Sequence, residues 1–153
     1  MIAINSRLTD ESLKRAGFTY IRRFAAIPNL RNTRWLVPLD SPAISSAAFS
    51  LYTPTRFSAK LKRAAARAAI RCHLPIWYRD EICIALPQAP AIETALAEQF
   101  PGQSIRLALS SGAPQGARNR RASALVLGDD GKLLAFAKLA RSSIAREILD
   151  ASR

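Results

Sequence analysis

The sequence predicts an α+β fold in which helices flank a small antiparallel sheet. Three strand-like runs with glycine-bearing connections follow one another between residues 104 and 140. An alanine-rich stretch over residues 55–73 has helical spacing, and two further strand-like runs precede it. With 153 residues, 49% of them hydrophobic, the chain suffices for one ordinary domain or for a small domain with a substantial appendage.

The first half opens with two predicted strands. They are FTYIRRFAAI (residues 18–27) and RWLVPL (residues 34–39), separated by Pro-Asn and Asn-Thr turn signals. Residues 18–39 form either a separate hairpin or an addition to the main sheet. A helix is expected next, because Asp40 and Ser41 precede a proline at its first position, and it should end near Tyr52.

Residues 55–73 give the strongest helix signal in the chain. The stretch is rich in alanine, the best helix former, and contains no acidic residue. Helical spacing predicts one apolar side, with the basic residues of the stretch largely elsewhere on the helix. That side would consist of Phe57, Leu61, Ala65, Ala68 and Cys72.

The second half is predicted to contain four strands and two helices. EICIAL (residues 81–86) reads as a strand, and APAIETALAEQF (residues 89–100) reads as a helix stopped by Pro101-Gly102. SIRLAL, SALVLG and KLLAFAKLA then form the three-stranded antiparallel sheet, and a last helix begins at Ser142 or Ser143.

The charge is strongly positive and unevenly distributed. The chain has 23 Lys and Arg against 11 Asp and Glu, a formal net charge of +12. Residues 1–76 hold 13 basic and 3 acidic side chains, and residues 77–153 hold 10 and 8. The first half is therefore where an anionic partner is expected to bind.

Cysteine and histidine usage argues against a metal centre. Cys72 and Cys83 are the only cysteines and His73 is the only histidine, too few for a zinc site. Asp10 and Glu11 come too early for a secretory signal, and no apolar run approaches the roughly 20 residues that span a bilayer. We therefore expect a cytoplasmic protein with reduced cysteines and no transmembrane segment.

The stretch SSGAPQGARNRRASALVLGDDGKLLAFAKLA suggests a phosphate-binding hairpin. Gly112 and Gly116 lie in a loop between two strands, where glycine lets backbone N–H groups approach a phosphate. Lys138 lies two strands further and shares a strand face with Leu134 and Phe136. A lysine on an apolar face requires a charged partner or ligand.

Residues 107–149 resemble the N-terminal lobe of aminoglycoside-phosphotransferase-like, protein-kinase-like enzymes. The matching residues are Asp129, Gly131, Leu134, Ala135, Phe136, Ala137 and Lys138. The resemblance implies a nucleotide-phosphate lysine at Lys138, a phosphate loop that includes Gly112 and Gly116, and at most weak binding of ATP. Glu147, on the following helix, is available as the acidic partner of the lysine.

The same resemblance implies an incomplete enzyme. Such kinases need a C-terminal lobe with a catalytic aspartate and metal-binding side chains, and no matching stretch follows here. We therefore expect residues 1–100 to be a basic α/β extension and residues 101–153 to be a truncated kinase-like lobe. It would have no catalytic residues and no metal ligands of its own, and a separate chain could supply the second lobe.

The alternative hypothesis is a small basic module that binds nucleic acid or another polyanion. Its candidate residues are Lys60, Lys62, Arg63, Arg67 and Arg71, which would contact phosphates without sequence preference. Arg22, Arg23, Arg31 and Arg34, near Tyr20, Phe24 and Trp35, would extend the surface and add stacking groups. A solvated helix face and an anionic membrane surface remain open as other interpretations of the helix.

Trp77 and Tyr78, beside Asp80 and Glu81, form a second aromatic and charged group. Adjacent carboxylates on a strand point to opposite faces, which is poor geometry for acid–base catalysis. We expect these residues to have turn and core roles.

Overall fold

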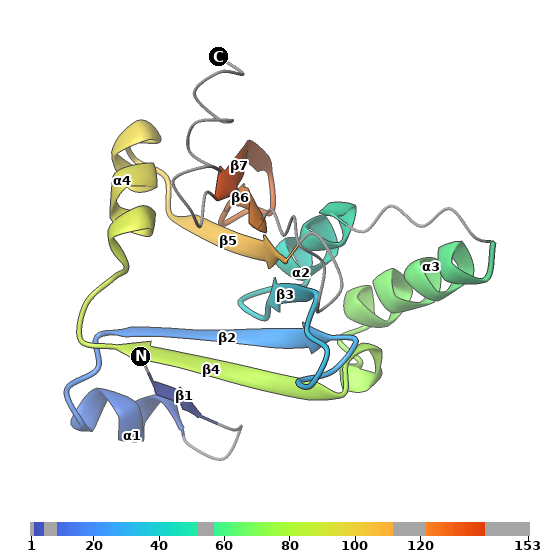
Figure 1. Ribbon diagram of the computed structural model, residues 1–153, viewed down its shortest axis with the longest axis horizontal. Coiled ribbons are helices and arrows are strands. Elements are labelled where there is room, and N and C mark those ends of the chain that lie inside the picture. The colour runs from blue at the N-terminus through green and yellow to red at the C-terminus, as the bar shows by residue number, and fades with distance from the viewer. Residues whose placement is uncertain (1, 5–8, 52–56, 112–121, 140–153) are drawn as a thin grey trace.

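The computed structural model describes residues 2–4, 9–51, 57–111 and 122–139. Seven strands form one sheet in the order β1-β4-β2-β3-β5-β6-β7, and every neighbouring pair is antiparallel (Figure 1). The predicted α+β class is confirmed. The strands are β1 (Ile2–Ile4), β2 (Tyr20–Ile27), β3 (Trp35–Pro38), β4 (Asp80–Leu86), β5 (Ile105–Ser110), β6 (Ala122–Gly128) and β7 (Leu133–Leu139).

Strands from both halves of the chain lie in the same sheet. β2 and β3 pair with each other, and β3 also pairs with β5 through Trp35 opposite Ser110 and Leu36 opposite Leu109. Residues 18–39 thus add to the main sheet and do not form a separate hairpin. The backbone hydrogen bonds cross the expected boundary at residue 100.

The described helical elements are mostly short. They are α1 (Asp10–Arg15), α2 (Pro42–Ala48), the 3₁₀ turn η1 (Phe49–Leu51), α3 (Phe57–Arg71), the 3₁₀ turn η2 (Pro75–Trp77) and α4 (Ala91–Gln99). α2 begins at Pro42, as the sequence predicted, and the Ser41 side chain caps it by accepting a hydrogen bond from the Ile44 N–H at 3.3 Å. β1 and α1 were not predicted, and the last predicted helix lies outside the described residues.

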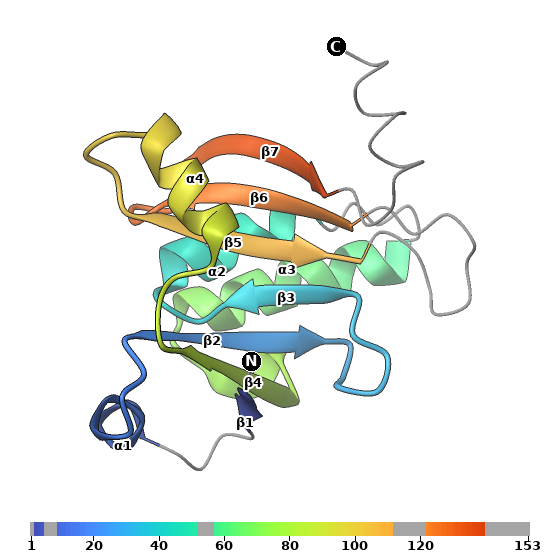
Figure 2. The same ribbon diagram turned by 60° about the vertical axis from the view of Figure 1, so that its left-hand side comes forward.

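The helices cover both faces of the sheet unequally. Figure 2 shows α2 and α3 behind the sheet and α4 in front of it. The core lies between the sheet and the α2–α3 side, where the buried side chains of β2, β3, β5 and β6 meet those of the helices. Its fully or nearly buried members are Ala25, Val37, Ile44, Ala48, Phe49, Ile70, Ala108, Leu125 and Leu127.

The apolar side of α3 that the sequence predicted is not the side that the structure buries. Ala69 and Ile70 are the buried residues of α3, whereas Phe57 is 82% exposed and Leu61 is 63% exposed. Figure 1 shows the N-terminal end of α3 projecting past the sheet, so no strand is available to cover Phe57. The small side chains of the alanines let α3 pack through a different stripe, which centres on Ala66 and Ile70.

α3 ends in a left-handed residue. His73 has φ 57°, and the Leu74 N–H donates to the Ala69 carbonyl at 2.9 Å, which closes the last turn. The chain then continues through η2 to Trp77, beside the core. Among the described residues no helix has the length and apolar character needed to cross a bilayer.

Candidate functional site

A pocket of about 340 Å³ lies where β2 and β3 meet α2, η1, α3 and η2. Its size is at the lower end of the range typical of small-molecule sites, roughly 300–1,000 Å³. We call it the aromatic pocket, because three rings line it and cations stand at its edge. The lining residues are Ile27, Pro28, Arg34, Trp35, Val37, Ala48, Phe49, Lys62, Arg63, Ala66 and Trp77.

The rings of the aromatic pocket are held by their neighbours. Phe49 meets Trp77 edge to face, with ring centroids 5.5 Å apart, and Trp77 meets Tyr78 in the same way at 4.7 Å. The Arg34 guanidinium lies 5.3 Å from the centroid of the Trp35 ring. Trp35 and Trp77 are the only two tryptophans of the chain, so both indoles line this one pocket.

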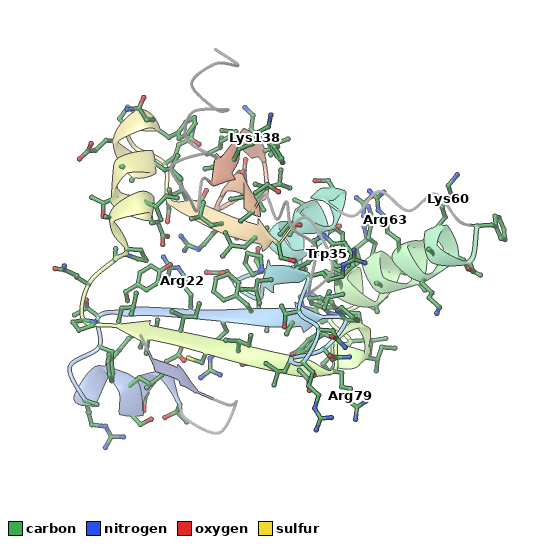
Figure 3. The ribbon with its side chains drawn as sticks, viewed as in Figure 1. Arg22, Trp35, Lys60, Arg63, Arg79 and Lys138 are labelled. Carbon is green, nitrogen blue, oxygen red and sulfur yellow. The ribbon has the colours of Figure 1, made fainter. Side chains whose placement is uncertain are left out.

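The side of α3 that faces the sheet determines which cations reach the pocket. Ala66 packs against the core, and residues three or four positions before it on a helix lie on the same side. Lys62 and Arg63 therefore reach the pocket, with Lys62 exposed and Arg63 half-buried. Figure 3 shows Arg63 near Trp35, and Lys60 farther out along α3.

Ion pairs neutralise several other arginines of the described chain. Arg22 lies 3.4 Å from Glu93, and Arg106 lies 2.6 Å from Asp40. Arg23 lies between two carboxylates, at 2.9 Å from Asp10 and 2.7 Å from Glu81. The prediction that Arg22 and Arg23 extend the basic helix surface is not supported, since Glu93, Asp10 and Glu81 already pair with them.

The other basic residues predicted on the helix divide between two positions. Arg67 donates to the Ser46 hydroxyl at 3.3 Å, which ties α3 to α2. Lys60 and Arg71 are exposed and do not line the aromatic pocket. The structure thus brings Lys62, Arg63 and Arg34 together around Trp35 and leaves Lys60 and Arg71 apart from them.

Lys138 lies on the edge strand β7 and is exposed. Phe136, two residues earlier, is 55% exposed, so this part of the strand face is not a desolvated apolar surface. Lys138 therefore needs no partner to offset desolvation, and its role as a phosphate-binding lysine stays a prediction. Gly112, Gly116 and Glu147, the other residues of the predicted phosphate site, lie outside the described residues.

A row of paired residues runs across the strands from the aromatic pocket to Lys138. Trp35 on β3 pairs with Ser110 on β5, Ser110 pairs with Ser123 on β6, and Ser123 pairs with Lys138 on β7. Directly paired residues of neighbouring strands point to the same side of a sheet. These four side chains, which we call the cross-strand row, therefore line one face from the aromatic pocket to the sheet edge.

A second hollow of about 500 Å³ adjoins the β2–β3 connection. Its lining residues are Asn29, Leu30, Arg31, Asn32, Arg79 and Asp80. Hydrogen bonds hold the connection in shape, among them three that its backbone N–H groups donate. The Arg34 N–H donates to the Ile27 carbonyl at 2.8 Å, the Asn32 N–H to Asn29 Oδ1 at 2.9 Å, and the Leu30 N–H to Asp80 Oδ2 at 2.9 Å.

The lining of the aromatic pocket is aromatic, aliphatic and cationic. Among the described residues that line it there is no carboxylate, thiol, hydroxyl or imidazole group. Within the described ranges, no three His, Cys, Asp or Glu side chains are grouped to hold a metal ion. Rings with cations at the edge suit a ligand that combines a planar group with negative charge.

Sequence reasoning identified part of this site. It grouped Lys62, Arg63 and Arg34 with Trp35, but it assigned Trp77 to turn and core roles and left Phe49 out. Trp77 does pack against the core, and it also lines the pocket. The available signal was that both tryptophans of the chain lie close to arginines.

Comparisons with known proteins returned no relatives. No protein-family model matches the chain, and searches of the curated proteins and of the solved structures found no match.

Proposed function

We propose that this protein is a basic module that binds nucleic acid through the aromatic pocket and the cations of α3 and the β2–β3 connection. The observation that carries the proposal is the placement of Trp35 and Trp77 in one pocket edged by Arg34, Lys62 and Arg63. Aromatic rings stack on bases, and arginine and lysine contact phosphates. The formal net charge of +12 adds long-range attraction to any polyanion.

The affinity should be electrostatic and dependent on salt. Neither Lys62 nor Arg63 forms an ion pair within the part of the chain that the structure describes. Each phosphate that such a side chain neutralises releases counterions, which gives a slope of about −0.7 per contact in a plot of log affinity against log salt for single strands.

Fluorescence anisotropy with a labelled oligonucleotide of about 20 residues tests the proposal, because single-strand binding sites rarely exceed that length. Reversing two charges at the pocket, Lys62→Glu with Arg63→Glu, should lower the affinity by at least about ten-fold and reduce the salt slope by about 1.4. The matched control reverses Lys14 and Lys132, which are exposed and lie outside the pocket lining.

The control variant changes the net charge by the same amount but leaves the aromatic pocket intact. It should therefore bind the oligonucleotide much more tightly than the pocket variant. Equal binding by the two variants would refute a site at the pocket and leave only the overall charge as the cause. No binding by the unchanged protein at low salt would refute the function itself.

Lys138 is the residue through which the kinase-like resemblance implies nucleotide binding. β5, β6 and β7 form the predicted three-stranded meander, with Lys138 on its third strand. We infer that nucleotide binding at this meander depends on this lysine. MgATP should then raise the melting temperature of the unchanged protein and leave that of Lys138→Ala unaltered, and equal shifts would refute the assignment. A partner chain with the second lobe and a cytoplasmic location stay predictions.

A further inference from the structure

We infer that the ligand of the aromatic pocket is a single strand, which inserts one unpaired base between the rings and runs its backbone along the cross-strand row to Lys138. The inference rests on the proposed nucleic-acid function and narrows it. It specifies a strand whose bases are unstacked, and it gives Lys138 a contact with a phosphate other than the one beside the inserted base.

The shape of the pocket favours an unpaired base over a duplex. Trp35 and Trp77 line a hollow of about 340 Å³, so a base must leave its stack to enter the hollow and reach their rings. Bases in a duplex are stacked and paired, and their extrusion costs a few kcal/mol. A single strand pays far less, since its bases are already free to splay outward.

The rings are already arranged before a ligand arrives. Trp77 is held edge to face by Phe49, and Trp35 has the Arg34 guanidinium over its ring. A site whose side chains are fixed loses less conformational freedom when it binds, which strengthens binding. The same guanidinium lies at the pocket edge, where it can contact the phosphate attached to the inserted base.

The cross-strand row supplies a path for the rest of the strand. Neighbouring strands are spaced about 4.8 Å apart, so the three steps from Trp35 to Lys138 span roughly 14 Å. Ser123 and Ser110 make the middle of this row polar, and both are half-buried. Lys138 at its end is exposed, and its side chain forms no ion pair within the described ranges.

The first experiment uses the two tryptophans as the probe. Because both line the aromatic pocket, their fluorescence should be strongly quenched when a base stacks on them, with no label required. Oligothymidylate should quench the emission and bind at least about ten-fold more tightly than a duplex of equal length, because the duplex must first extrude a base. Tight binding of both without quenching would overturn the inserted base and leave the broader proposed function intact.

The second experiment separates stacking from simple burial. Trp35→Phe keeps an aromatic face and should bind within about three-fold of the unchanged protein, whereas Trp35→Leu keeps apolar volume only and should lose about ten-fold. Anisotropy with labelled oligothymidylate measures both variants. Equal affinities would overturn stacking at this residue.

The third experiment tests the path to Lys138. A strand of two nucleotides is too short to join Trp35 to Lys138, whereas about eight nucleotides, at 3.4 Å each even when stacked, exceed the roughly 14 Å between them. Lys138→Ala should therefore weaken binding of the longer strand several-fold and leave the dinucleotide unaffected. Lys132→Ala, also exposed and near β7, is the matched control. An equal loss at both lengths, or none at either, would overturn the path.

Discussion

The aromatic pocket depends on which side of α3 faces the sheet. Two substitutions that shorten side chains of α3 to alanine test this orientation. Ile70 is 3% exposed and belongs to the core, whereas Leu61 is 63% exposed. Helical spacing alone placed Leu61 on the apolar side of the helix, whereas the structure buries Ile70 on a different side. If α3 packs as in the structure, replacing Ile70 with alanine should lower the stability more than replacing Leu61. If the side with Leu61 faced the sheet, the order would be reversed.

The expected magnitudes differ several-fold. Ile70→Ala removes three buried carbon groups, worth about 0.8 kcal/mol each, and leaves a cavity, for a total loss of about 3 kcal/mol in the free energy of unfolding. For a protein of this size, this loss lowers the melting temperature by roughly 6–12 °C. Leu61→Ala should change the stability by at most about 0.5 kcal/mol, because the side chain is mostly in solvent already.

Urea unfolding followed by far-ultraviolet circular dichroism measures the free energy of unfolding of the unchanged protein and of both variants. A change in the midpoint at constant slope reports stability alone. If Leu61→Ala proved the more damaging substitution, α3 would be rotated relative to the sheet. Lys62 and Arg63 would then no longer stand at the edge of the pocket, and the binding proposals would lose their geometric basis.

Three other predictions follow from buried side chains. Cys72 is exposed and Cys83 is buried, so a thiol reagent should modify one cysteine quickly in the native protein and both only after unfolding; two fast thiols would contradict the buried position. Burial raises the pKa of the Cys83 thiol above its ordinary value of 9.0 and raises that of the Tyr20 hydroxyl, so both groups ionise more readily in the unfolded chain. The contribution of these two groups to the stability should therefore be constant below about pH 8 and fall as the pH rises through about 9, and Tyr20→Phe should reduce the fall above about pH 10 in urea unfolding at stepped pH. Glu93→Gln should cost about 1–3 kcal/mol, because it leaves the guanidinium of Arg22 half-buried without its carboxylate, and a smaller loss in the double variant with Arg22→Met would identify the pair as the cause.

Local sequence signals predicted most of the strands. β2, β3 and β7 lie within runs that were predicted from branched and apolar residues bounded by turn residues, and β4, β5 and β6 match their predicted runs to within one residue at each end. The start of α2 was equally readable, because Ser41 and Pro42 are a capping residue and a first-turn proline. These elements depend on residues adjacent in the chain, and for that reason a single sequence is sufficient to find them.

The assembly of the elements could not be read in the same way. The pairing of β3 with β5 joins residues about 75 positions apart, and no local pattern specifies it. In α3, alanines occur on several sides, so the spacing of apolar residues allowed more than one core face. The pocket combines side chains from β3, η1, α3 and η2, which are far apart in the sequence, so no local pattern could group Phe49 and Trp77 with Trp35.

The strand order has a consequence for the kinetics of folding. β5, β6 and β7 are consecutive both in the chain and in the sheet, so this meander can form through short loop closures. β1 must instead wait for β4, since Ile2 pairs with Ala85, and proteins dominated by such distant contacts fold slowly. During synthesis the edge of β2 that later receives β4 stays open while α2 and α3 are being made, and in that interval the new chain is most exposed to mispairing with another strand.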